Sequence, residues 1–258
     1  MSDAPLIIYG AHPVEEILLA APDKARRVLA LDWDAPAARP IAALADAAGV
    51  RRDRATRDEL DRLCEGGNHQ GVALVGKPFN YAQLDVVLKR VADEPLARLL
   101  VLDGIQDVGN LGAILRSAAA LGVAAVIVPK KRAAGVTPAA VRASAGQALR
   151  VPVVRVTNLA RTLDALKEAG FWVVGSALDP EGTSTQAPWE VDMAARIALV
   201  VGSEHKGMRP LVARGCDLLV QIPMTPGVES MNAAAAAATL MYEASRQGAA
   251  KRANDSLE

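Results

Sequence analysis

The sequence predicts an α/β protein whose C-terminal part is built on a parallel β-sheet, preceded by a smaller α/β region. From Leu99 onward, apolar runs of strand length alternate with helix-like segments, and strands that are apolar throughout are typical of sheets buried on both faces. Shorter apolar runs alternate with amphipathic segments in residues 1–78. The length of 258 residues also favours two modest domains over one.

The first region, residues 1–78, is predicted to be a small α/β unit. Its expected strands and helices are, in chain order, LIIYG, PVEEILLAA, RRVLALD, PIAALADAAG, VRR, RDELDRLC and GVALVGKP. The charged amphipathic segment over residues 79–97 contains Pro95 near its end. We expect this segment to be a linker helix between the two domains.

The second region is predicted to span residues 98–250, followed by a polar tail over residues 251–258. Its strand candidates are LLVLD, AAVIVP, VPVVRV, FWVVGS, IALVVG and LLVQIP, with helices between several of them. Ligands of open parallel sheets bind at the carboxyl ends of the strands. The loops that follow these strands are therefore the candidate site.

Composition excludes several classes of protein. No run of about 18 apolar residues lacks a charge or a turn former, and no signal peptide is indicated, so we expect no membrane span and a cytoplasmic location. Cys64 and Cys216 have no Cys or His at ligand spacing, so neither a disulfide framework nor a metal site is expected. Aromatic residues make up 3%, which disfavours binding of single-stranded bases mainly by stacking.

Positive charge is concentrated in the middle of the chain. Residues 98–158 contain 8 Lys and Arg against 2 Asp and Glu, whereas residues 1–97 contain 12 against 15 and residues 159–258 contain 9 against 12. Such a block is typical of a surface that faces the phosphates of a nucleic acid, and a solvated face without a partner is the alternative. The candidate RNA-binding residues are Lys130, Lys131, Arg132 and Arg142.

Three polar, glycine-containing segments follow predicted strands, namely GIQDVGNLGAILRSAAALG, GSEHKGM and IPMTPGVESMN. None of them contains the dinucleotide-binding, P-loop or nucleophile-elbow pattern. In the first segment, Asn110 and Arg116 lie in the early part of a predicted helix and are able to hold a phosphate together. Alternatively, Asn110 only caps the helix and Arg116 is a surface residue.

The other two segments also offer binding groups. Glu204 lies between Gly202 and Gly207, whose missing side chains permit close approach of a ligand, although a turn without a catalytic role is the alternative. In the third segment, Ser230 or Asn232 is expected to cap the alanine-rich helix that follows. The prolines and glycine of this loop indicate irregular backbone that can bond an adenine-like ring, and the alanines permit a neighbouring backbone or partner subunit to approach closely.

Taken together, the three segments resemble the motifs of the SpoU-type RNA ribose 2'-O-methyltransferases of the SPOUT superfamily. The matching patterns are N-x-x-x-x-x-R, G-x-E-x-x-G-M and I-P-M-x-x-x-x-x-S-[LM]-N. IYGAHPVEEILL and NHQGVALV are similar to the ribosomal-protein-like RNA-binding domain attached to the family's large-subunit rRNA guanosine methylases. The resemblance covers nearly the whole chain.

The resemblance implies a C-terminal domain folded as a trefoil knot, S-adenosyl-L-methionine as cofactor and a homodimer. The implied reaction is methylation of a guanosine ribose 2'-hydroxyl in large-subunit (23S) ribosomal RNA. A tRNA 2'-O-methyltransferase and a non-catalytic RNA-binding factor of ribosome assembly with the same fold are the alternatives.

The resemblance also implies roles for individual residues. The family's catalytic and substrate-binding positions correspond here to Asn110, Arg116, Glu204, Ser230 and Asn232. The positions where its backbone contacts the cofactor correspond to Gly202, Ile222 and Met231. The chain departs from the family at Ala234, where relatives carry a second Ser, and before Asn110, where they carry Pro-His.

Overall fold

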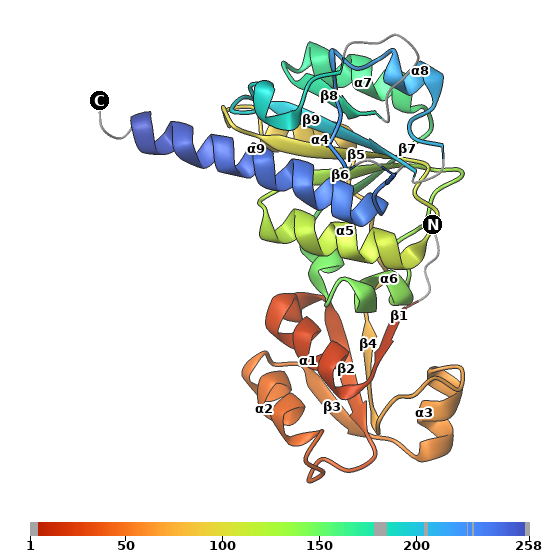
Figure 1. The fold of residues 1–258 in the computed structure, drawn as a ribbon. Helices are drawn as coiled ribbons and strands as arrows, with labels where there is room; N and C mark the ends of the chain where they lie inside the picture. The colour runs from red at the N-terminus through yellow and green to blue at the C-terminus, as the bar shows by residue number, and fades with distance from the viewer. Residues whose placement is uncertain (1–4, 178–184, 204–205, 226, 229, 256–258) are drawn as a thin grey trace. The chain divides into compact units, whose positions relative to one another are not determined.

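The computed structural model describes residues 5–177, 185–203, 206–225, 227–228 and 230–255. The chain divides into two compact units, one made of residues 1–80 and 135–150 and the other of residues 81–134 and 151–258 (Figure 1). In the part of the chain that the structure describes, no helix is both long enough and apolar enough to cross a membrane.

The first unit contains a four-stranded mixed sheet in the order β1-β4-β2-β3. Strands β1 and β2 run antiparallel to β4, and β3 runs parallel to β2. The elements are β1 (Leu6–Tyr9), α1 (Ala11–Ala20), η1 (Pro22–Lys24), β2 (Ala25–Ala30), α2 (Arg39–Ala47), β3 (Arg51–Arg54), α3 (Arg57–Leu63) and β4 (Val72–Gly76). The prediction of a small N-terminal α/β unit is confirmed.

Residues 135–150 pack with this first unit. They form α6 (Pro138–Ala143), which contacts β1, and the short 3-10 helix η2 (Gln147–Leu149). The guanidinium carbon of Arg142 lies 4.4 Å from the ring centroid of Tyr9. The predicted C-terminal domain over residues 98–250 includes this segment, whereas the structure packs it with the first unit. A residue pattern indicates which element forms, but it does not indicate which unit that element packs against.

The second unit contains a six-stranded sheet in the order β10-β8-β9-β5-β6-β7, with every neighbouring pair parallel. Its strands are β5 (Arg98–Asp103), β6 (Ala125–Pro129), β7 (Val153–Val156), β8 (Trp172–Ser176), β9 (Ile197–Gly202) and β10 (Leu218–Val220). Every residue of β5 and β6 is buried, as expected for central parallel strands. The predicted parallel sheet is confirmed, although its last strand ends three residues before Pro223.

Helices cover this sheet. They are α4 (Leu84–Arg90), α5 (Val108–Ala120), α7 (Leu159–Glu168), α8 (Pro210–Ala213) and α9 (Ala233–Asp255), with the 3-10 helix η3 (Pro188–Glu190). Val87 and Val91, from α4 and its end, share a core with α7 and with Leu99 and Val101 of β5. The helix expected in the linker therefore belongs to the core of the second unit.

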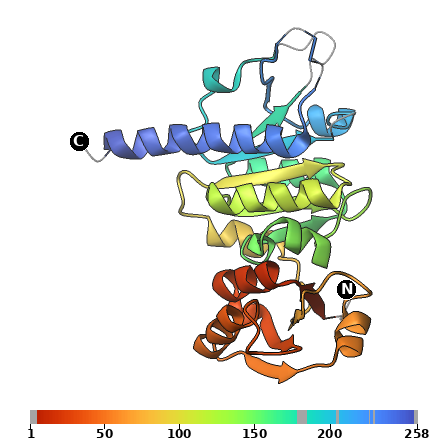
Figure 2. The ribbon, with the colours of Figure 1, turned by 60° about the horizontal axis from the view of Figure 1, so that its bottom comes forward.

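The packing of helix α9 explains why its sequence is so rich in alanine. Its buried residues are Ala233, Ala237, Leu240, Met241, Ala244 and Gly248, and it packs against α5, β9 and η3. Figures 1 and 2 show α9 lying beside α5. The small side chains thus serve close packing within the chain, and the helix continues to Asp255, into the predicted polar tail. The knotted path implied by the resemblance stays a prediction.

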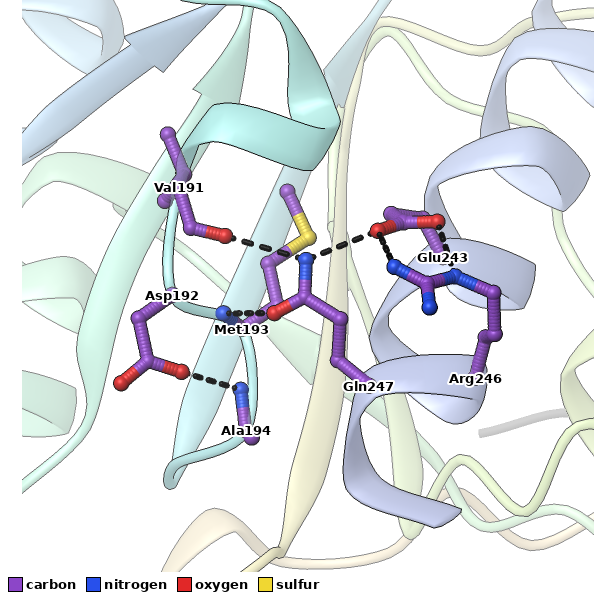
Figure 3. Close-up of polar contacts among 7 residues, drawn as sticks. All are labelled: Val191, Asp192, Met193, Ala194, Glu243, Arg246 and Gln247. Carbon is purple, nitrogen blue, oxygen red and sulfur yellow. Dashed lines mark hydrogen bonds and ion pairs between the residues drawn. The ribbon is translucent and has the colours of Figure 1, made fainter. Parts of the chain in front are cut away.

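Polar side chains of α9 form hydrogen bonds to the segment that follows η3 (Figure 3). The side-chain oxygen of Gln247 accepts from Met193 N at 2.7 Å, and its amide nitrogen donates to Val191 O at 3.1 Å. That nitrogen also donates to Glu243 Oε1 at 2.8 Å, while Arg246 binds the same carboxylate through two nitrogens. Arg246 holds the pKa of the Glu243 carboxyl below its usual range. The network stabilises the middle of α9.

Candidate functional site

A pocket lies at the carboxyl ends of β8 and β9, next to the start of α9. It is lined by Gly202, Ile222 and Met231, the three residues predicted to contact the cofactor. Other lining residues include Ser176, Ala177, Val201, Ser203, Met224 and Ala236. The fold therefore brings together groups from the ends of two strands, from the loop after β10 and from α9.

Gly202 stands where no side chain fits. A Cβ atom added there would overlap the backbone of Gly207 and Met208. Ser203 N donates to Gly207 O at 3.1 Å and Gly207 N donates to Ser203 O at 2.8 Å, so Gly207 lies against the end of β9. The missing side chain of Gly202 is what allows this close approach of two backbone segments.

The lining suits the adenosyl part of the cofactor that the resemblance implies. Val201, Ile222, Met224 and Met231 offer apolar surface for a ring, and the irregular backbone around them offers hydrogen-bonding groups. The void measures about 50 Å³, whereas small-molecule pockets hold roughly 300 Å³ or more. This void is therefore small for the whole cofactor.

Asn232 joins the start of α9 to α5. Its Oδ1 atom accepts from Ala234 N at 2.9 Å and from Ala235 N at 3.3 Å, and its Nδ2 atom donates to Asn110 Oδ1 at 3.0 Å. The expected capping of the alanine-rich helix by Asn232 is confirmed. Two predicted catalytic residues that lie 122 positions apart in the sequence are thereby in contact.

The residue that caps α5 is Asp107, whose Oδ1 accepts from Asn110 N at 2.6 Å. The alternative interpretation of Asn110 as the cap is wrong, because Asn110 already lies inside the first turn. The side chain of Asn110 instead reaches Asn232. Arg116 is exposed further along α5, and among the described residues the structure records no hydrogen bond or ion pair of its side chain.

The remaining predicted residues are distributed more widely. Ser230 is exposed and does not line the pocket, and Glu204 lies outside the described residues. Lys130, Lys131 and Arg132 are exposed directly after β6 in the second unit, whereas Arg142 belongs to the first unit. Within the described ranges, no three His, Cys, Asp or Glu side chains form a group able to hold a metal ion.

One ion pair near the pocket was missed by the sequence analysis. Asp103, the last residue of β5, is 1% exposed and accepts from Arg209 N at 2.8 Å and from Arg209 Nε at 2.7 Å. A signal was present, because the strand candidate LLVLD ends in a carboxylate and a buried carboxylate needs a cationic or hydrogen-bonding partner. The identity of that partner was not visible in the sequence.

The fold and the pocket define an α/β domain with a ligand site at the carboxyl ends of parallel strands, where such sheets hold nucleotide-like cofactors. Residues 97–242 match the SpoU rRNA Methylase family, and residues 7–82 match the family model described as RNA 2'-O ribose methyltransferase substrate binding. The chain belongs to the SpoU rRNA methylase family.

Individual relatives resemble almost the whole chain. The 23S rRNA (guanosine-2'-O-)-methyltransferase RlmB of Pseudomonas syringae is 42% identical over 95% of this chain and 97% of its own length. The protein of the same name from Escherichia coli is 40% identical over 93% and 98%. A crystal structure of the SpoU methyltransferase AviRb from Streptomyces viridochromogenes in complex with AdoMet has a TM-score of 0.73 at 26% identity, covering 95% of this chain and 90% of that one. The predicted family is confirmed, and so is the α/β fold with a small N-terminal domain and a separate parallel-sheet domain.

Proposed function

We propose that the protein transfers a methyl group from S-adenosyl-L-methionine to the ribose 2'-hydroxyl of a guanosine in 23S ribosomal RNA. The observation that carries the proposal is the pocket that gathers Gly202, Ile222 and Met231 beside the Asn110–Asn232 contact. The near full-length similarity to RlmB proteins supports the substrate. The ribosomal RNA substrate would be met in the cytoplasm.

The cofactor, when bound, supplies an electrophilic methyl group. Arg116 stabilises the negative charge that develops on the 2'-oxygen or grips the adjacent phosphate, because a free guanidinium is too basic to be neutral at pH 7. Asn110 and Asn232 fix each other through their hydrogen bond and orient the ribose. Glu204 and Ser230 complete this set, and Lys130, Lys131, Arg132 and Arg142 bind RNA phosphates.

The proposal is tested by incubating the purified full chain with labelled S-adenosyl-L-methionine and 23S rRNA from a strain that lacks the gene. We expect one new 2'-O-methylguanosine in 23S rRNA, located by primer extension at low nucleotide concentration, and none in tRNA from the same strain. Methylation of tRNA alone would assign the protein to the alternative substrate. Absence of cofactor binding in calorimetry of the folded protein would leave only a non-catalytic RNA-binding role.

We also propose a homodimer in which the exposed face of α9 lies at the interface. Tyr242 on α9 is 60% exposed, and Trp189 of η3, an element that contacts α9, is 62% exposed. Large exposed apolar groups often mark an interface. Tyr242→Glu should therefore give monomers in analytical ultracentrifugation, while Tyr242→Phe stays dimeric. Dimers of unchanged affinity in the Glu variant would exclude this face. Ala237 is unsuitable for the test because it is fully buried within the chain.

A further inference from the structure

We propose that Arg209, held in position by Asp103, binds a backbone phosphate of the RNA in a basic groove beside the cofactor pocket. The inference rests on the proposed function and adds a substrate-binding site to it. Asp103 and Arg209 lie outside the three motif segments.

The groove consists of two adjoining cavities of about 260 and 700 Å³ in the second unit. Lys131, Arg132 and Arg209 line both cavities, and Lys206 lines the smaller one. Among the described lining residues the only carboxylate is Asp103, which Arg209 already neutralises. The groove therefore carries excess positive charge, which suits a phosphodiester.

Arg209 differs from an ordinary surface cation because its guanidinium is already oriented. The Asp103 carboxylate takes one hydrogen bond from the Arg209 backbone and one from Nε. No described residue accepts from the two terminal nitrogens, and the side chain is 50% exposed. These two nitrogens form the planar fork that binds phosphate through paired hydrogen bonds. Orientation by a buried carboxylate lowers the entropy cost of that binding.

The groove adjoins the place where the reaction is proposed to occur. Ser203 and Gly207 line both the smaller cavity and the cofactor pocket, so the two spaces adjoin. An RNA strand whose target ribose lies against the cofactor pocket would have a neighbouring phosphate within reach of the groove. Lys131 and Arg132, which follow β6 and line the same groove, would contact the same part of the RNA strand.

The first test compares Arg209→Gln, which removes the charge but keeps an amide donor, with Arg214→Gln. Arg214 is exposed just past α8 and lines neither cavity, so it is the matched control. We expect Arg209→Gln to raise the Kd for a 23S rRNA fragment about tenfold, and to lower the slope of log K against log salt by about 0.7 to 0.9. The control should match the wild type, and calorimetry should give an unchanged Kd for S-adenosyl-L-methionine.

Unchanged RNA affinity and salt slope in a folded Arg209→Gln protein would overturn the inference, as would weakened cofactor binding with normal RNA binding. If this variant does not fold, the double variant Lys131→Ala/Arg132→Ala replaces it, because these side chains do not support Asp103. That double variant should lose about 1.4 to 1.8 units of slope, and an unchanged slope would refute the groove. Failure of the wild-type protein to methylate RNA would instead count against the proposed function.

Asp103 is proposed to position the Arg209 guanidinium, and its substitution should change KM and kcat differently. Asp103→Asn leaves Arg209 charged but less firmly held, so the KM for RNA should rise several-fold while kcat at saturating RNA stays within about twofold of the wild type. The Kd for the cofactor should stay unchanged. A fall in kcat with an unchanged KM would show that Asp103 does not act through RNA binding.

Discussion

Arg116→Ala should lower the rate of methyl transfer at least about a hundredfold, a loss of roughly 3 kcal/mol of transition-state stabilisation. The side chain is exposed on α5, and the structure records no partner for it in the described part of the chain. Its removal should therefore leave stability and cofactor affinity nearly unchanged. Such a variant would bind the cofactor normally and, at saturating RNA, fail at methyl transfer.

Single-turnover assays at saturating RNA measure this effect directly. Arg116→Lys should restore little activity, because one ammonium group does not reproduce the planar fork of donors. Arg161→Ala is the control, since Arg161 is an exposed arginine on α7 and lines neither the cofactor pocket nor the groove. A single-turnover rate near that of the wild type in Arg116→Ala would mean that another group activates the 2'-hydroxyl.

Gly202→Ala should weaken binding of S-adenosyl-L-methionine by about ten- to a hundredfold, in line with roughly 1 to 3 kcal/mol for inserting a methyl group into packed structure. The new Cβ would overlap the backbone of Gly207 and Met208 and push the loop away from the end of β9. Since this loop forms part of the pocket wall, the cofactor site would be displaced with it.

Calorimetric titration of the cofactor checks this prediction, with circular dichroism to establish that the variant is folded. Ser203→Ala is the matched control, because it alters a small side chain of the same pocket without adding an atom against the loop. The control should bind within about threefold of the wild type, since its hydroxyl makes one long hydrogen bond of 3.5 Å to Gly207 O. Equal cofactor affinity in Gly202→Ala and the wild type would show that the loop position does not shape the site.

The site was partly predictable from local signals. The motif positions Gly202, Ile222 and Met231 line one pocket, and Asn232 caps α9. The contact between Asn232 and Asn110 was not predictable, because it needs the start of α9 to lie beside the start of α5. The alternative in which Asn110 caps α5 is wrong, because the backbone geometry puts Asp107 at the cap and Asn110 inside the first turn.

The sequence by itself determined the elements of this protein. The strand candidates of the C-terminal part are apolar throughout, which indicates strands buried on both faces, as in a parallel sheet. In residues 1–78, short apolar runs alternate with amphipathic segments, which indicates a separate small α/β unit. The hydrophobic periodicity and the capping residues are local properties of the chain, so helices and strands are predictable from the sequence alone.

Only the tertiary structure decided which elements meet. The strand order β10-β8-β9-β5-β6-β7 places the end of β5 next to β9, and there Asp103 meets Arg209 106 positions away. The same packing puts α4 into the second core, residues 135–150 with the first unit, and α5 against the alanines of α9. Such pairings depend on which buried faces fit together across the whole chain, and a local pattern shows that a face is apolar without showing what covers it.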